Sequence, residues 1–301
     1  GEQSRAAQFL NSPYGTPVIG WRQEMEQLTR DDALAWYRRF YAPNNAVLVV
    51  AGDVTPDEVK TLATEYYGPL APSDDIPPRL RPQEPPQLAA RRLTFTDARV
   101  AQPYLSRSYL ATERNPDDQK KAAALTVLAE ILGGNPQTSV LSRKLVFDKG
   151  DAIYASAFYD GMSIDKTTFS IALMPAQDVA LPEAEAALDA ALNEFLKEGI
   201  DPAQFERIRT QIRAAQIYQQ DDAQGLAQQY GEALASGFSI ADVQSWPDVL
   251  MSVTADDVMA AAREVLTPAD SVTGYIERPK DAPPPAPDAP VSLPATQEVT
   301  Q

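Results

Sequence analysis

The stretch that decides the fold is LTRDDALAWYRRFYAPNNAVLVVAGDV, residues 28–54. Thr29 is typical of a helix N-cap, and Asp31 and Asp32 follow it in the first turn, where the helix dipole favours negative charge. Apolar residues then recur at helical spacing until Ala-Pro-Asn-Asn, residues 42–45, ends the predicted helix. The next run, AVLVVA at residues 46–51, has the composition of a central strand that is covered on both faces.

A second copy of this plan occupies residues 253–279, VTADDVMAAAREVLTPADSVTGYIERP, at a constant offset of 225 positions. The matched pairs are Thr29 and Thr254, Asp31 and Asp256, Asp32 and Asp257, Ala35 and Ala260, Arg38 and Arg263, Pro43 and Pro268, and Val47 and Val272. The repeat indicates two domains of one α+β fold. If the second domain starts near residue 91, the offset places the start of the first about 130 residues before Gly1. We therefore expect one complete domain and the last third of its twin.

The chain between and around the two copies divides into four predicted regions. Residues 1–67 are expected to be the C-terminal part of the first domain, and they include an ordered loop at 11–22 and a second helix that Thr55 and Pro56 begin. Seven prolines predict an interdomain linker over residues 68–90, and proline also predicts a disordered tail over 281–301. Residues 91–280 are the expected complete second domain. Its predicted strands are 91–96, 101–110, 152–158 and 167–173. Its predicted helices are 115–132, 139–147, 181–198 and 240–250, with one or two long helices over 202–236.

Composition excludes several classes of function. The 301 residues carry a net charge of −16, which opposes binding to nucleic acid or to anionic membrane surfaces. The sequence contains no cysteine and no histidine, so thiol chemistry, a Ser-His-Asp triad and histidine ligation of a metal are all excluded for this chain. It also contains no apolar run long enough to predict a membrane span.

Few residues qualify as candidates for a site. The acidic pairs at helix starts, among them 117–118 and 221–222, are explained by helix capping. The aromatic pairs Trp36-Tyr37 and Tyr66-Tyr67 have core spacing, and we expect them to be buried. The remaining candidates are a substrate-binding set in which a glycine pair ends a helix and two polar side chains could contact a peptide carbonyl: Gly133, Gly134, Arg143 and Tyr154.

The run from Ser12 to Trp21, SPYGTPVIGW, together with residues 28–54, resembles the later part of the catalytic domain in the M16 zinc peptidases, the pitrilysin and mitochondrial-processing-peptidase family, bacterial branch. The run VLAEILGGNPQTSVLSRKLV in the second half resembles that family's non-catalytic second domain. The resemblance covers nearly all of residues 1–280. It implies duplicated α+β domains with antiparallel-rich mixed sheets that face each other like a clamshell.

In that family an inverted HxxEH motif and a downstream Glu hold zinc, and the motif Glu is the general base for the zinc-bound water. The resemblance places these residues upstream of Gly1, so no catalytic or metal-binding residue is expected in this chain, whereas zinc is expected in its full-length parent. Residues 127–131, VLAEI, align with the motif in the second domain and carry apolar residues at the two histidine positions.

Many relatives also carry a substrate-binding Arg and Tyr, seven residues apart, in the second domain. Val146 and Ile153 align with these positions, and Arg143 and Tyr154 are eleven residues apart, so the pair is not predicted here. Its absence resembles those zinc-bearing chains whose pair comes from a separate subunit. The resemblance therefore implies a companion M16-like subunit, or a homodimer, as a partner.

These inferences lead to one main hypothesis and two alternatives. The chain is predicted to be the inactive C-terminal portion of a bacterial zinc metalloendopeptidase, and to supply half of the wall of a chamber that encloses a peptide or unfolded polypeptide. Alternatively, it is a non-catalytic partner or scaffold subunit of an M16 heterodimer, or a peptide-binding module without proteolytic function. Family habit favours the periplasm or cell envelope over the cytoplasm.

Overall fold

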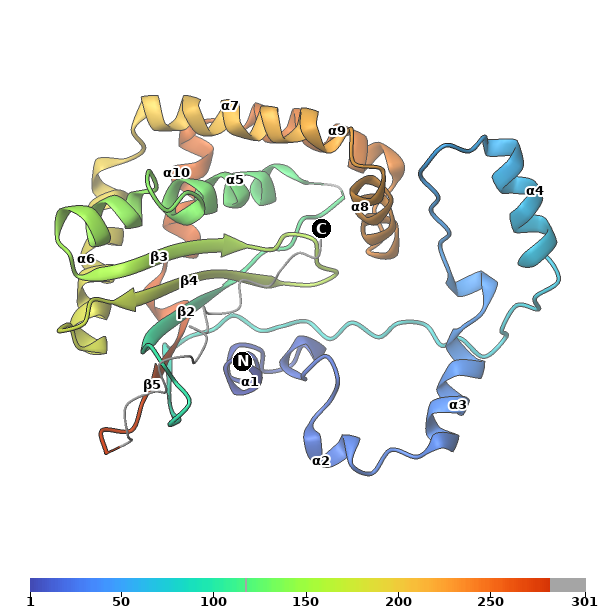
Figure 1. Cartoon of the computed structure of the whole chain (residues 1–301), viewed down its shortest axis with the longest axis horizontal. Helices are drawn as coiled ribbons and strands as arrows, with labels where there is room; N and C mark the ends of the chain where they lie inside the picture. Colours follow the sequence, from blue (N-terminus) through green and yellow to red (C-terminus); the bar gives the residue numbers. More distant parts are fainter. Residues whose placement is uncertain (117, 282–301) are drawn as a thin grey trace.

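A five-stranded mixed sheet forms the centre of the computed structural model, which describes residues 1–116 and 118–281 (Figure 1). Its strands are β1 (Arg91–Thr96), β2 (Tyr104–Ala111), β3 (Ala152–Tyr159), β4 (Thr167–Pro175) and β5 (Ser271–Glu277), in the order β1-β5-β2-β4-β3. Only β1 and β5 pair in parallel, and the other three pairs are antiparallel. The predicted strands of the second domain are thus confirmed. The predicted tail, residues 281–301, lies outside the described residues except for Asp281.

Helices cover one face of this sheet (Figure 1). The helices nearest the strands are α5 (Lys120–Ala129), α6 (Leu181–Glu198) and α10 (Ala255–Val265). Beyond them lie α7 (Pro202–Gln219) and α9 (Ile240–Ser252), whereas α8 (Ala223–Ala235) lies beside the end of the sheet. Alternate residues of β2 point into this layer, so Leu105 and Tyr109 are buried with Phe169 of β4 and Leu128 of α5. Burying one such leucine contributes about 1.5–3 kcal/mol. No helix within the described residues is long and apolar enough to cross a membrane.

Two predicted helices of the second domain differ in detail from the structure. The helix predicted from residue 115 begins at Lys120 and continues beyond Ala129 as the π-helical segment η3 (Glu130–Gly134). The helix predicted at 139–147 is largely the π-helical segment η4 (Ser142–Asp148). Both segments pack against β3.

The two sequence copies share their local structure. Thr29 and Asp32 form a capping box at the start of α3 (Arg30–Phe40), and Thr254 and Asp257 form the same box at α10. A short 3₁₀ turn follows each helix, η2 (Pro43–Asn45) in the first copy and η5 (Pro268–Asp270) in the second. The caps that the sequence predicts are therefore confirmed, including the one that Thr55 makes at α4 (Pro56–Tyr66).

The copies differ in what surrounds them. The second copy ends in β5, which hydrogen-bonds to β1 on one side and to β2 on the other. The strand predicted at 46–51 does not form, because no strand in the described part of the chain pairs with it, and Val47, Leu48 and Val50 remain exposed. The predicted burial of the aromatic pairs is also wrong. Trp36 is 63% exposed, and Tyr37, Tyr66 and Tyr67 are exposed as well.

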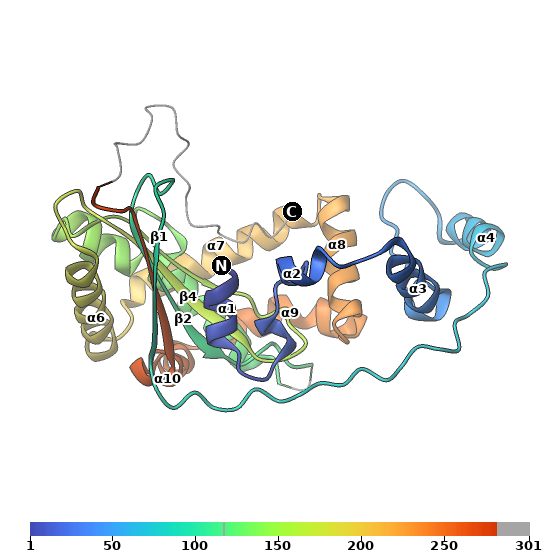
Figure 2. The ribbon, with the colours of Figure 1, turned by 90° about the horizontal axis from the view of Figure 1, so that it is seen from below.

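Helix α1 (Glu2–Gln8) lies against the sheet, apart from α3 and α4, and contacts β5 and β2 (Figure 2). The segments η1 (Pro13–Gly15) and α2 (Arg22–Met25) follow it. The proline-rich residues 68–90 run without helix or strand and return to the sheet near their end. There Gln87 donates to the backbone carbonyl of Ser271, 2.8 Å away, and accepts a hydrogen bond from Gln8. This segment therefore joins α1 to the start of β5.

Candidate functional site

The face of the sheet that α5, α6 and α10 leave uncovered forms the floor of a cavity with a volume of about 650 Å³. Because side chains alternate along a strand, the residues between the core positions of β2, β3 and β4 project onto this face. Small hydroxyl side chains supply most of the floor: Ser106, Ser108, Ser156, Thr168 and Ser170. Such a floor offers hydrogen-bond donors and acceptors without filling the space above it.

Small residues lie side by side across four strands of this floor. The register pairs Gly274 of β5 with Ser106, Ser106 with Ala172 of β4, and Ala172 with Ser156 of β3. A Cβ atom at Gly274 would lie 3.6 Å from the hydroxyl oxygen of Ser4, so α1 approaches the sheet closely at this row. The row of small residues on the sheet and the helix α1 above it therefore bound the cavity on two opposite sides.

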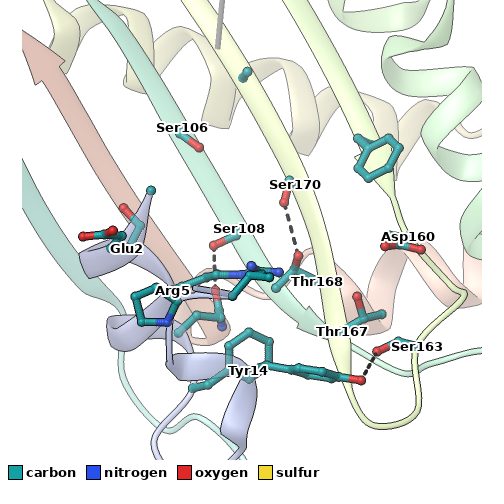
Figure 3. Close-up of a pocket in the computed structure, with 18 of the residues that line it drawn as sticks. Glu2, Arg5, Tyr14, Ser106, Ser108, Asp160, Ser163, Thr167, Thr168 and Ser170 are labelled. Atoms are coloured by element: carbon teal, nitrogen blue, oxygen red, sulfur yellow. Dashed lines mark hydrogen bonds between the residues drawn. The ribbon is translucent and has the colours of Figure 1, made fainter. Parts of the chain in front are cut away.

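Residues of α1 and η1 form the opposite wall (Figure 3). The rings of Phe9 and Tyr14 meet edge to face with their centroids 5.9 Å apart. The Tyr14 hydroxyl accepts hydrogen bonds of 3.1 Å from the Ser163 hydroxyl and from the backbone N–H of Ile164. Tyr14 therefore joins this wall to the loop between β3 and β4.

The Glu84 side chain holds the same wall from the other side. Its carboxylate is buried and accepts backbone N–H bonds of 2.8–2.9 Å from Leu10, Asn11 and Ser12. Burial alone would raise the pKa of Glu84, but these three donors lower the pKa below its ordinary value. The chain turn after α1 is thus organised around a charged carboxylate.

Three charged side chains line the cavity. Glu2 and Arg5 come from α1, and Asp160 comes from the end of β3 (Figure 3). Asp160 accepts a 3.1 Å hydrogen bond from the backbone N–H of Met162. Burial raises the pKa of Asp160, and the positive charge of Arg5 acts in the opposite direction. Apolar groups of Phe9, Tyr14, Phe158 and Met162 complete the lining.

The four residues that the sequence indicated for substrate binding do not line this cavity. Gly133 is buried where η3 meets the backbone of β3, and Gly134 lies beside the carboxylate of Glu130. Arg143 is exposed on η4 and donates to Gln204 at 3.4 Å, and Tyr154 is half-buried on β3. The structure therefore places these four residues away from the cavity, and brings other residues together there.

The segment that the resemblance predicts to correspond to the family's metal motif, residues 127–131, lies in the core. Val127 and Ile131, which the resemblance places at the two histidine positions, are both buried. Burial raises the pKa of the intervening Glu130, which ends α5. Among the described residues no group of three or more carboxylates lies close enough together to hold a metal ion. The residues present thus do not fit a zinc site.

Comparison with known proteins gives a consistent result. Residues 27–212 match the family described as "Peptidase M16 inactive domain". The zinc protease PqqE of Helicobacter pylori is 23% identical over 89% of this chain and 60% of that protein. An uncharacterized zinc protease of Mycobacterium tuberculosis is 23% identical over 87% of this chain and 58% of that protein. The chain therefore spans about 60% of the length of these relatives.

Solved structures show the same fold. A protease from Helicobacter pylori superimposes with a TM-score of 0.81 at 21% identity, over 89% of this chain and 64% of that chain. An M16-like peptidase from Alicyclobacillus acidocaldarius gives a TM-score of 0.75 at 23% identity, over 92% of this chain and 65% of that chain. The first half of the periplasmic protease PqqL from Escherichia coli gives 0.74 at 15% identity, over 92% and 61% of the two chains.

Proposed function

The chain belongs to the peptidase M16 family, to which it is matched through the inactive domain, and we propose that it is the non-catalytic portion of a bacterial M16-type zinc endopeptidase. In this proposal the uncovered face of the sheet lines the chamber that encloses a peptide. One observation carries it. The cavity lies between the sheet of the inactive domain and residues 1–19, whose sequence resembles the catalytic domain, so it occupies the junction where a substrate would pass.

The lining suits an extended polypeptide. An extended chain presents backbone N–H and C=O groups at regular intervals, and the hydroxyls of Ser106, Ser156 and Ser170 can each donate to or accept from such groups. The rings of Tyr14 and Phe158 offer apolar contact to substrate side chains. Because the residues of this chain do not fit a zinc site, the proposal assigns it binding and enclosure, and no step at a metal.

The first copy of the repeat supports the proposal that residues 28–67 complete another domain. Neither α3 nor α4 buries a residue, although both carry large apolar side chains on their surfaces. An exposed apolar run such as residues 46–51 is rare on a protein surface unless another element covers it. By analogy with β5, we propose that this run becomes a central strand between two strands of the completed first domain.

Hydrogen exchange tests whether residues 46–51 become a strand in a completed first domain. In the 301-residue chain we expect the amides of residues 46–51 to exchange rapidly, because they are outside any sheet, whereas the central amides of β5 are protected. In a longer polypeptide that includes about 130 preceding residues of the same reading frame, the exchange rates of the amides of 46–51 should be about 100-fold lower than in the 301-residue chain. Strong protection of 46–51 in the 301-residue chain would contradict the proposal.

Photo-crosslinking tests the peptide-binding face. A benzophenone amino acid replaces Phe158, which lines the cavity, and the purified chain is irradiated with a fluorescent, unstructured peptide of about 20 residues. We expect covalent labelling of this variant that an excess of unlabelled peptide suppresses. The matched control carries the same amino acid at Phe147, an exposed position on η4 that does not line the cavity, and should be labelled at background level.

Two outcomes of this experiment would count against the proposed function. Equal labelling at positions 158 and 147 would show that the peptide contacts the surface without selecting the cavity. Zinc-dependent hydrolysis of the peptide by the purified 301-residue chain would overturn the non-catalytic assignment.

A further inference from the structure

Arg5 is a charged side chain of the cavity whose guanidinium has no hydrogen-bond or ion-pair partner among the described residues. It lies half-buried on α1, and Figure 3 shows its side chain extending across the cavity toward Thr168 on β4. A guanidinium carries five N–H donors in a planar fork, and half-burial reduces their access to water. The cavity therefore contains a positive group whose donors are open to a ligand.

Several other polar groups of the cavity already have partners. Asp160 accepts the backbone N–H of Met162, Ser108 donates to Gln8 at 2.6 Å, and Ser170 contacts Thr168 at 3.5 Å. The hydroxyls are neutral, and Glu2 is exposed at the start of α1. A ligand group that enters beside Arg5 thus meets a cation together with neutral hydroxyl donors.

We infer that Arg5 binds a carboxylate of the peptide that occupies the cavity, so that this side chain sets a preference for acidic or C-terminal substrate groups. The inference rests on the proposed peptide-binding function. A carboxylate is the only negatively charged group of an unmodified peptide, and its two oxygens match the fork of a guanidinium. The Thr168 hydroxyl lies on the strand toward which Arg5 points and offers a further donor.

Two sources can supply this carboxylate, and a set of four fluorescent peptides of equal length and related sequence separates them. The first has a free C-terminus and no acidic residue, the second has an amidated C-terminus and one internal Glu, the third has both carboxylates, and the fourth has neither. Affinity for the 301-residue chain is measured by fluorescence anisotropy. We expect at least one of the singly charged peptides to bind about tenfold more tightly than the uncharged peptide.

Substitutions assign the preference to Arg5. In Arg5→Gln the tenfold preference should vanish while the uncharged peptide binds as before, and Arg5→Lys should retain part of the preference because it keeps the charge and loses the fork. The control is Arg207→Gln, which removes an exposed arginine of α7 that does not line the cavity. Gly1 also lines the cavity, so the measurements are repeated on a chain acetylated at Gly1 to separate the effect of its ammonium group.

The outcomes distinguish the inference from the function on which it rests. Equal binding of all four peptides, or a preference that survives Arg5→Gln and disappears on acetylation of Gly1, would overturn the inference and leave peptide binding in place. Absence of binding by every peptide would overturn both. Circular dichroism melting of each variant confirms that the fold is retained, as expected for a side chain without ion pairs.

Discussion

Replacing Gly133 by alanine is expected to destabilise the second domain by about 3 kcal/mol, near the upper end for overpacking a core. A Cβ atom at this position would lie 1.9 Å from the backbone nitrogen of Ala157 and 2.4 Å from the carbonyl carbon of Ser156. Backbone atoms of a paired strand cannot move away as a flexible side chain can, so η3 and β3 must separate. Urea unfolding followed by circular dichroism should show a lower midpoint.

Gly231→Ala is the matched control for this substitution. Gly231 lies within α8, and the nearest atom to its Cβ position is a methyl group of Val49 at 3.9 Å, which is ordinary contact. Alanine favours a helix interior by about 1 kcal/mol over glycine, so this variant should be as stable as the parent or more stable. A Gly133→Ala midpoint equal to that of Gly231→Ala would show that the close packing of η3 on β3 is not required.

Glu185→Gln is expected to cost about 3 kcal/mol of stability, because it removes one of the two carboxylates, Glu185 and Asp189, that pair with a buried cation. Arg107 of β2 is 4% exposed and Glu185 of α6 is 5% exposed, and their side chains form an ion pair of 2.5 Å. Glu185 also accepts two hydrogen bonds from Arg92 of β1, at 2.6 and 2.7 Å. The cluster thus joins two strands to the helix layer. Glu206→Gln, on the exposed surface of α7, is the control and should change stability by less than about 0.5 kcal/mol.

The same cluster predicts how stability depends on pH. Burial would raise the pKa of Glu185, but hydrogen bonds from Arg92, Tyr275 and Arg107 lower it from 4.5 to about 2. A carboxylate whose pKa is lower in the folded state stabilises the fold above its unfolded pKa, and this contribution is lost as the pH falls toward 2. The stability difference between the parent and Glu185→Gln should therefore narrow between pH 6 and pH 3. A difference that is constant over this range would contradict an ionised Glu185.

Much of the second domain could be predicted because local chemistry and tertiary environment agree there. Alternation around Ser106 and Ser108 predicted β2, and helix start and stop residues predicted α6 at its observed bounds, Leu181–Glu198. The family resemblance is confirmed by the match to the M16 inactive domain. The helix start predicted at residue 115 is too early, since α5 begins at Lys120.

The candidate site could not be predicted in the same way. Its walls come from residues 1–19 and from strands that lie more than 80 positions later in the chain, so no local motif unites them. The sequence contained a signal for only one part of the cavity, its floor. The serines of β2 were visible as an alternation, but nothing in the sequence indicated that α1 would lie above them, with Arg5 and Tyr14 facing the same space.

The sequence by itself determined the repeated unit, its helix caps and its family, because a cap such as Thr29 with Asp32 depends on residues three positions apart. Only the tertiary structure decided whether the predicted strand within each copy forms. A strand needs hydrogen-bond partners from other parts of the chain, and β5 has them on both sides, whereas residues 46–51 have none among the described strands. Two copies with the same helix cap and the same turn therefore end in a central strand in one case and in an exposed segment in the other.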